Sequence, residues 1–321
     1  MMSMPGRPNV TVCVVTYNHA RYIADCLLSI LSQDVDANVR IVVGDDSSTD
    51  GTTEIVAAIA AQWPGRIEHS VHQERLGAIG NLRFVVGQAG GDFVAHLDGD
   101  DFWLPGKLRE QLMLLENHPE SPACFTNAFV FDDTRHPVGV FTNAKSGTYD
   151  LAALLLRGNF LNHSSLVYRV AHRATVLELP TPFIDYRIHL GLALLGPLVY
   201  TDKAFVGYRC GSTGSMLATA NDAVRERYYE ALLSAIPDVA SGVRVAACAD
   251  MMRRIIFRAT RSRNPALVRA WWARLCAAAQ VGSLTMLRKT ILNVCGESYR
   301  QFVQIMSIRL LRASPRVLYF R

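Results

Sequence analysis

The first hundred residues alternate between two hydrophobic patterns. Short continuous apolar runs, typical of buried strands, occur at 10–16, 40–44, 67–71 and 93–97. Between these runs, apolar residues recur three or four positions apart, which predicts helices near 23–31, 55–63 and 79–88. Strands that alternate with helices in this way form a largely parallel sheet. We therefore predict an α/β fold, a Rossmann-like and mostly parallel sheet with helices on both faces.

The pattern changes after residue 107. A helix that ends near Asn117 is followed by strand-like stretches at 123–131 and 164–168 and by an apolar helix around 184–195. From there the pattern becomes helical nearly to the end, with candidate helices at 223–235, 243–260, 265–279, 284–294 and 299–312. We expect a mixed α/β part from 1 to 215 and a helical region from 216 to 321.

The composition is that of a globular protein, because half of the 321 residues are hydrophobic and 19% are charged. The chain shows no initial basic-then-apolar segment and no apolar run near the roughly 20 residues that span a bilayer. Seven scattered cysteines without a CxxC pair argue against structural zinc or a disulfide framework. We therefore expect a cytoplasmic protein.

The net charge of +5 is unevenly distributed. Residues 244–321 contain 15 lysines and arginines against two acids, a net of +13, which leaves −8 on residues 1–243. Arginines at 254, 258 and 261 share a helix face, which could contact an anionic membrane at the inner face of the cell, a second subunit or a polyanionic glycan. The alternative is a helical unit packed on the rest of the protein. Nucleic-acid binding is disfavoured, because no recognised motif or interleaved stacking aromatics accompany the charge.

The most informative segment is the acidic turn that follows the strand at 93–97. Asp98 and Asp100 are separated by Gly99, so in extended backbone they project to the same side. Two adjacent carboxylates repel unless a cation neutralises them, and oxygen ligands suit Mg²⁺ or Mn²⁺ with substrate phosphates. The alternative is an acidic turn that caps the helix near Pro105. A second acidic cluster, at 45–50, also follows a strand. Ligands bind at this edge of a parallel sheet, so the sequence favours a ligand site over a helix cap.

Several motifs in fixed order resemble glycosyltransferase family two, the inverting, sugar-nucleotide-dependent enzymes of the GT-A fold. The similarity covers roughly the first 215 residues. It is carried by 14–18 (VVTYN), 29–33 (SILSQ), 44–52 (GDDSSTDGT), 77–81 (GAIGN), 90–94 (GGDFV) and 97–105 (LDGDDFWLP). The resemblance implies a GT-A domain at 1–215, with a nucleotide-binding half at about 1–105 and an acceptor-side half at about 106–215, followed by a basic helical region at 216–321.

The resemblance also implies a role for individual residues on the donor side. Thr16, Tyr17 and Asn18 would line the nucleoside pocket, and Asp46 would accept a hydrogen bond from the base. Asp98 would lie near the ribose and the metal, and Asp100 would bind the Mn²⁺ or Mg²⁺ ion that bridges the donor diphosphate. Arg75 is a further candidate for the phosphate side.

On the acceptor side, 183–186 (FIDY) resembles the site of the family's general base, which implies that Asp185 takes the proton from the acceptor hydroxyl. The alternative is that Asp185 only stabilises a helix N-terminus. His163 is either an acceptor contact or a buried structural histidine. Many relatives carry a histidine two positions after Arg209, where this chain has Gly211, so Arg209 or the loop 211–215 would replace its contact with metal or diphosphate.

The expected activity is transfer of a hexosyl or N-acetylhexosaminyl group from a nucleotide-diphosphate donor, of UDP type, to a glycan or glycolipid hydroxyl in surface polysaccharide or glycolipid synthesis. A nucleotidyltransferase or a dinucleotide-dependent oxidoreductase would need a glycine-rich phosphate loop after the first strand, where this chain has TYNH. A non-catalytic nucleotide- or glycan-binding protein on the same fold remains the alternative.

Overall fold

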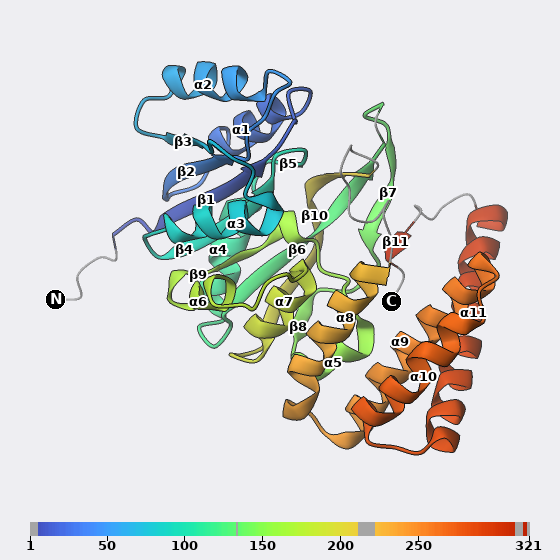
Figure 1. Ribbon diagram of the computed structural model, residues 1–321. Helices are drawn as coiled ribbons and strands as arrows, with labels where there is room; N and C mark the ends of the chain where they lie inside the picture. The colour runs from blue at the N-terminus through green and yellow to red at the C-terminus, as the bar shows by residue number, and fades with distance from the viewer. Residues whose placement is uncertain (1–5, 133, 211–221, 312–316, 320–321) are drawn as a thin grey trace.

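The computed structural model describes residues 6–132, 134–210, 222–311 and 317–319, with the backbone alone for 300–311. It contains one large mixed sheet flanked by helices (Figure 1). The described strands follow the order β11-β7-β6-β9-β4-β1-β2-β3, and β10 adds beside β6 while also pairing with the short β5 and β8. The predicted α/β class with helices on both faces is confirmed.

The N-terminal half is the parallel part of the sheet. The strands β1 (Asn9–Thr16), β2 (Asn38–Asp45), β3 (Ile67–Val71) and β4 (Phe93–Asp98) pair in the order β4-β1-β2-β3. Alternate residues of β1 face opposite sides, as a pleated strand requires. Val12 packs with α1 (Ile23–Leu31) and α2 (Thr52–Gln62), whereas Cys13 packs with α3 (Gly77–Gly87). Helices therefore cover both faces of the predicted strands.

The second half of the sheet is mixed in direction. After β5 (Phe102–Trp103) and α4 (Lys107–Asn117), the strand β6 (Ala123–Phe131) pairs antiparallel with β7 (Pro137–Thr142) and parallel with β10 (Leu198–Arg209). The strand β8 (Gly147–Tyr149) pairs antiparallel with β10. The predicted strand at 164–168 is partly wrong, because His163–Ser165 forms a 3₁₀ turn and β9 spans Val167–Arg169. β9 lies antiparallel to both β4 and β6 and so joins the two halves.

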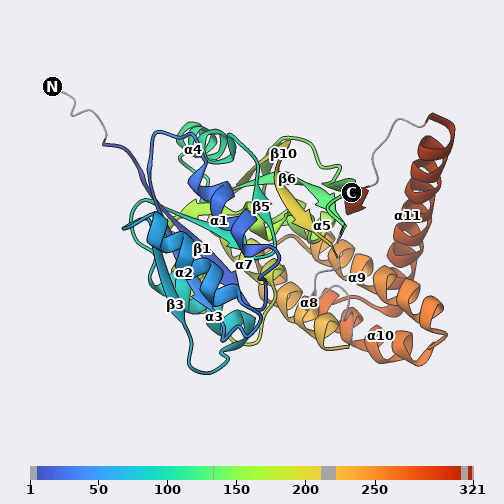
Figure 2. The same ribbon diagram turned by 90° about the horizontal axis from the view of Figure 1, so that it is seen from above.

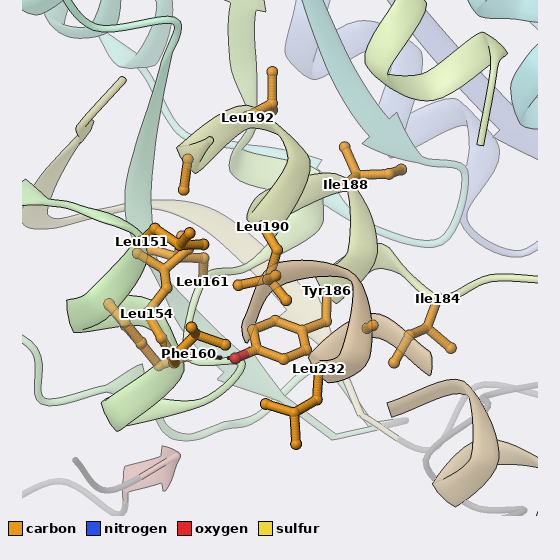
Figure 3. Close-up of a cluster of buried hydrophobic side chains, with 14 of the residues drawn as sticks. Leu151, Leu154, Phe160, Leu161, Ile184, Tyr186, Ile188, Leu190, Leu192 and Leu232 are labelled. Carbon is orange, nitrogen blue, oxygen red and sulfur yellow. Dashed lines mark hydrogen bonds between the residues drawn. The ribbon is translucent and has the colours of Figure 1, made fainter. Parts of the chain in front are cut away.

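The helix α7 (Asp185–Ala193) is held in place by its neighbours α5 (Leu151–Arg157) and α8 (Asp222–Ala235), while the short α6 (Ala174–Leu177) precedes it. Figure 3 shows Tyr186 between leucines of α5 and Leu232 of α8, with its hydroxyl donating to the backbone oxygen of Leu154 at 3.1 Å. Tyr186, Leu190 and Leu232 are all at most 5% exposed. This packing fixes the first turn of α7, which carries Asp185.

The C-terminal region is helical, as predicted, but its last helix and a strand differ from expectation. The helices α9 (Ser241–Ser262) and α10 (Ala266–Ala279) pack together, and α11 (Ser283–Leu311) packs on α9. The prediction of two helices at 284–294 and 299–312 is wrong, because α11 is continuous across residues 295–298. β11 (Val317–Tyr319) returns to the sheet and pairs in parallel with β7. Figures 1 and 2 place α11 and β3 at opposite ends of the molecule.

Candidate active site

A cavity of about 580 Å³ opens where the strands β1, β2 and β4 end and extends toward α7. It is lined by all ten residues that the sequence nominates, namely Thr16, Tyr17, Asn18, Asp46, Arg75, Asp98, Asp100, His163, Asp185 and Arg209. These residues come from both halves of the sheet and are up to 193 positions apart in the chain. The fold therefore brings the nominated donor-side and acceptor-side groups into one space.

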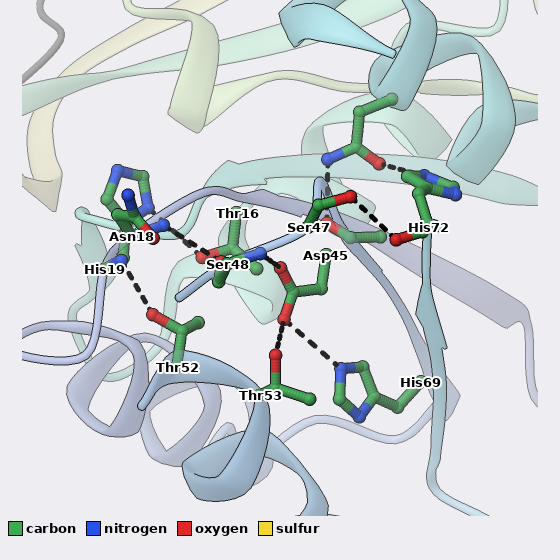
Figure 4. Close-up of polar contacts among 12 residues, drawn as sticks. Thr16, Asn18, His19, Asp45, Ser47, Ser48, Thr52, Thr53, His69 and His72 are labelled. Carbon is green, nitrogen blue, oxygen red and sulfur yellow. Dashed lines mark hydrogen bonds and ion pairs between the residues drawn. The ribbon is translucent and has the colours of Figure 1, made fainter. Parts of the chain in front are cut away.

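The loops after β1 and β2 are tied together by hydrogen bonds (Figure 4). Asn18 has a positive φ of 54°, its backbone N–H donates to Ser48 Oγ at 2.9 Å, and its side-chain oxygen accepts from the N–H of Thr49 at 2.8 Å. Asparagine tolerates this left-handed conformation better than most residues. The N–H of His19 donates to Thr52 Oγ1 at 2.8 Å. One wall of the cavity is thus a rigid pair of loops.

Asp45, at the end of β2, supports these loops from below and does not line the cavity. Its carboxylate accepts from the N–H of Ser48 at 2.9 Å and from Thr53 Oγ1 at 2.5 Å, and His69 lies 3.9 Å away. Burial opposes ionisation, but the hydrogen bonds from His69, Ser48 and Thr53 outweigh it and lower the pKa of Asp45 to about 2.

Asp46 is buried and lies at the cavity wall. Its two oxygens accept from the N–H groups of Leu76 at 2.6 Å and Gly77 at 3.0 Å, at the start of α3. Each carboxylate oxygen has a second lone pair, so Asp46 can still accept from a ligand. Arg75 lies 3.8 Å from Asp46, and its guanidinium is 3.7 Å from the centre of the Tyr17 ring. These contacts hold Arg75 over the part of the cavity nominated for the nucleotide.

The acidic turn is pressed against the loop after β1. An added Cβ at Gly99 would lie 2.8 Å from Thr16 Oγ1 and 2.9 Å from His19 Nδ1, so only glycine allows this approach. Asp101 points inward, is 1% exposed, and its carboxylate lies 2.6 Å from Ser164 Oγ. Burial, together with the charges of Asp100 and Asp98, raises the pKa of Asp101. Asp98 and Asp100, unlike Asp101, face the cavity.

Asp98 is held as a carboxylate. His96 Nε2 lies 3.0 Å from Asp98 Oδ1, and Ser164 Oγ lies 3.3 Å from Oδ2. Although burial opposes ionisation, the hydrogen bond and the charge of His96 lower the pKa of Asp98 well below its usual range. His96 was not nominated from the sequence, because a histidine inside an apolar strand gives no functional signal.

The donor set suits a hard divalent cation. Two carboxylates, Asp98 and Asp100, face one cavity, which fits Mg²⁺ or Mn²⁺ bound through one or two carboxylates plus substrate phosphates. No three histidine, cysteine, aspartate or glutamate side chains are grouped as a metal site in the described ranges. A cation at Asp98 and Asp100 would therefore take its remaining ligands from the nucleotide and water.

Asp185 is on the opposite side of the cavity at the first turn of α7. Its Oδ1 accepts from the N–H of Tyr186 at 2.7 Å and from Asn159 Nδ2 at 3.2 Å. Burial raises the pKa of Asp185 although both of these hydrogen bonds lower it. A carboxylate with an elevated pKa that faces a cavity is suited to act as a general base. Asn159, which also lines the cavity, was missed because an isolated asparagine carries no sequence signal.

Arg209 and an aromatic wall complete the cavity. The Arg209 guanidinium donates to Asp25 Oδ2 at 2.9 Å and lies over the ring of Tyr22, while its backbone N–H donates to Asp101. The wall consists of Phe141 from β7, Tyr208 from β10 and Tyr319 from β11, with Phe141 5.3 Å and 4.7 Å from the two tyrosine rings. Gly211 and the loop 211–215 lie outside the described residues.

Known proteins resemble this chain in sequence. Residues 11–170 match the model of Glycosyl transferase family 2. Putative glycosyltransferase EpsE of Bacillus subtilis is 35% identical over 130 residues, 40% of this chain and 46% of that protein. A UDP-Glc:alpha-D-GlcNAc-diphosphoundecaprenol beta-1,3-glucosyltransferase of Escherichia coli, WfgD, is 33% identical over 110 residues, 34% of this chain and 42% of that protein.

Solved structures share the fold over nearly the whole chain. S. aureus TarS 1–349 in complex with UDP-GlcNAc superimposes with a TM-score of 0.65 at 20% identity and covers 92% of both chains. The mannosyltransferase PcManGT of Pyrobaculum calidifontis, in complex with GDP-Man and Mn²⁺, gives a TM-score of 0.54 at 20% identity, over 94% of this chain and 84% of that one. The motifs, the fold and the family match agree, and the chain belongs to glycosyl transferase family 2.

Proposed function

We propose that the protein is an inverting, divalent-metal-dependent glycosyltransferase that moves a sugar from a UDP-type donor to a hydroxyl acceptor. The observation that carries the proposal is the shared cavity, which has Asp98 and Asp100 on one side and Asp185 on the other. The TarS structure contains UDP-GlcNAc, and the name of WfgD includes UDP-Glc. Both favour a UDP-sugar donor of hexosyl or N-acetylhexosaminyl type.

The proposed reaction is a single displacement. Thr16, Tyr17, Asn18, Asp46 and Arg75 bind the nucleotide, and Asp98 and Asp100 would hold Mn²⁺ or Mg²⁺. When bound, the cation supplies Lewis acidity to the diphosphate oxygens. Asp185 removes the acceptor proton while the acceptor oxygen bonds to the anomeric carbon from the side opposite the diphosphate. The bond from that carbon to the diphosphate breaks, and the configuration inverts.

For the acceptor we propose a glycan or glycolipid hydroxyl in surface polysaccharide or glycolipid synthesis. The support is the diphosphoundecaprenol acceptor in the name of WfgD and the aromatic wall, whose rings can cover the apolar face of a sugar. His163 and Arg209 are the proposed contacts to acceptor or diphosphate. The division at residue 215 stays a prediction, because Val224, Tyr228 and Tyr319 from the C-terminal region also line the cavity.

We further propose that the C-terminal region contacts an anionic membrane from the cytoplasmic side. Leu284, Leu287 and Ile291 are spaced three and four apart on α11 and are 72%, 44% and 50% exposed, with Arg288 and Lys289 exposed beside them. A second copy of the chain would bring two regions of net charge +13 together, which favours a lipid surface over a dimer. In the described part of the chain, no helix is both long and apolar enough to cross a bilayer.

The central proposal is tested by titrating UDP-sugars into the protein with and without Mn²⁺ and by measuring donor hydrolysis. Asp100→Asn is expected to abolish Mn²⁺-dependent binding and hydrolysis. Asp34→Asn is the matched control, because Asp34 is exposed, pairs with the exposed Arg109 and does not line the cavity. Unchanged hydrolysis in Asp100→Asn would contradict the metal assignment, and nucleotide binding without any turnover by the wild type would favour a non-catalytic binder.

A further inference from the structure

A chain of three polar side chains, two of which line the cavity, leads to Asp185. His163 Nδ1 lies 3.2 Å from His189 Nε2, His189 Nδ1 lies 3.2 Å from Asn159 Oδ1, and Asn159 Nδ2 lies 3.2 Å from Asp185 Oδ1. His189 is fully buried and Asn159 is 9% exposed. Three successive contacts of this length inside a packed region fix the side chains relative to each other. We call His163, His189 and Asn159 the support chain.

The direction of every proton in the support chain follows from its end at Asp185. A carboxylate can only accept, so the Asn159 amide nitrogen must face it and the amide oxygen must face His189. His189 then carries its proton on Nδ1 and offers the Nε2 lone pair to the Nδ1–H of His163. Both rings are neutral, because burial lowers the pKa of His189 to about 3 and also lowers that of His163.

The support chain determines which oxygen of Asp185 is available. Oδ1 is engaged by Tyr186 and Asn159, whereas Oδ2 accepts no hydrogen bond from any described residue. Rotation of the Asn159 amide by half a turn would set its oxygen against the carboxylate and its NH₂ against the Nδ1–H of His189. Both new contacts would be repulsive, so the Asp185 carboxylate and the His189 Nδ1 proton hold the amide in the same orientation.

The other end of the support chain reaches the acidic turn. The His163 ring is 4.2 Å from the ring of His96, which contacts Asp98. His163 lines the cavity, and its Nε2 has no partner among the described residues. Asp98, proposed as a metal ligand, and Asp185, the proposed general base, therefore lie at the two ends of one continuous set of contacting side chains.

We propose that Asn159 and His189 are positioning residues for Asp185, which keep the carboxylate ionised and present its Oδ2 to the acceptor hydroxyl. This inference rests on the proposed role of Asp185 as the base. Asn159 and His189 do not touch the reacting atoms. Their effect is to orient the carboxylate through Asn159 and to prevent the amide from turning over.

The pH profile of kcat tests the proposal. Asn159→Asp places a second carboxylate against Asp185, which disfavours ionisation, so the acidic limb is expected to move up by about one pH unit or more. At a pH on that limb, kcat falls by about tenfold for each pH unit by which the limb moves. Asn159→Ala removes the donor to Asp185 together with the contacts of the amide to His189 and Tyr228, and it moves the limb less, in the same direction. His189→Phe removes one of the two contacts that hold the amide in this orientation and also moves the limb upward.

The controls separate positioning from loss of folding. Asn38→Asp makes the same chemical change at an exposed position and leaves the limb in place. The nucleotide affinity of the three variants stays within about twofold of the wild type, because neither Asn159 nor His189 contacts a nominated nucleotide residue. If kcat falls equally at every pH while the limb stays in place, the residues are merely structural and the proposal is overturned.

A measurement on the unaltered protein keeps the test independent of the variants. ¹⁵N NMR of histidine-labelled protein is expected to show neutral His163 and His189, both protonated on Nδ1. An Nε2-protonated ring at His189 would overturn the inference. Asp185→Asn separates the assignment of Asp185 as the base from the positioning role of the support chain. An active Asp185→Asn enzyme refutes the base assignment, whereas an inactive one with an unmoved limb in the Asn159 variants refutes only the support chain.

Discussion

Gly99 lies against Thr16 so closely that a single methyl group cannot be inserted between them. The methyl carbon would be 2.8 Å from Thr16 Oγ1 and 2.9 Å from the Thr16 Cβ. The turn that carries Asp98 and Asp100 and the loop that carries Tyr17 and Asn18 are therefore in direct contact. Their separation sets the distance between the proposed metal ligands and the proposed nucleoside pocket.

Gly99→Ala is expected to reduce transfer by about tenfold or more, because the turn must move away from Thr16 and misalign the donor. Gly87→Ala is the matched control, since a Cβ there meets nothing within 4 Å. The measurement is kcat/KM for the donor together with a melting temperature. Equal activity of the two variants would show that the contact does not position the donor.

Asp45 should contribute to the pH dependence of stability. Its pKa is about 2 in the folded protein and near 3.8 when unperturbed, so its stabilisation is fully present above about pH 5 and is lost as the pH falls toward 2. The contribution above pH 5 is about 2 kcal/mol. In urea unfolding, Asp45→Asn should therefore lose less stability than the wild type between pH 5 and pH 3. Parallel curves for the two proteins would contradict this assignment.

Lys107 is fully buried, and its Nζ lies 3.9 Å from the Trp103 ring without a hydrogen-bond partner in the described ranges. Burial lowers the pKa of Lys107. The unfolded chain therefore binds a proton at Lys107 more readily than the folded chain does, and the stability of the wild type rises with pH. Lys107→Met should raise the unfolding free energy near pH 7 by about 1 kcal/mol and flatten that dependence. Lys203→Met, at an exposed lysine, is the control. A destabilised Lys107→Met would mean that the contact with Trp103 outweighs the cost of burial.

The exposed face of α11 predicts binding to anionic vesicles. Leu284→Ser with Ile291→Ser should reduce the affinity for phosphatidylglycerol vesicles, measured by co-sedimentation, by about a hundredfold or more, because two side chains that enter the lipid contribute roughly 1.5–3 kcal/mol each. Vesicles of phosphatidylcholine alone should bind the wild type weakly, since they do not attract the basic region. Equal binding to both lipids, or a concentration-dependent dimer that the double variant abolishes, would contradict the proposal that an anionic membrane is the partner.

The strands and helices of the first hundred residues could be predicted because each has a strong local period, and the motifs on them identified the family. The strand β10 was missed because polar residues, Asp202 and Lys203, interrupt its apolar pattern where register shifts occur. The continuity of α11 was missed because Gly296 and Ser298 are weak helix formers. Packing on α9 overrides that local preference.

The nominated residues of the cavity lie in motifs that sequence comparison can detect. The side chains that hold them in place do not. Asn159 and His189 are 30 positions apart, and their contact exists only because α7 packs beside α5. His96 lies inside a strand whose pattern predicts burial alone. Side chains of this kind acquire a function through tertiary placement, which no local pattern encodes.

The pairing of β11 with β7 has a consequence for how the enzyme is made. Tyr319 packs against Phe141, although about 180 residues of chain separate them. One wall of the cavity therefore cannot form during synthesis until that entire span has left the ribosome. A nascent chain would fold its nucleotide-binding strands early yet hold an open-sided cavity. Any recombinant fragment that stops before residue 317 would lack this wall of the cavity. Fusions that displace β11 should be avoided in preparing the protein.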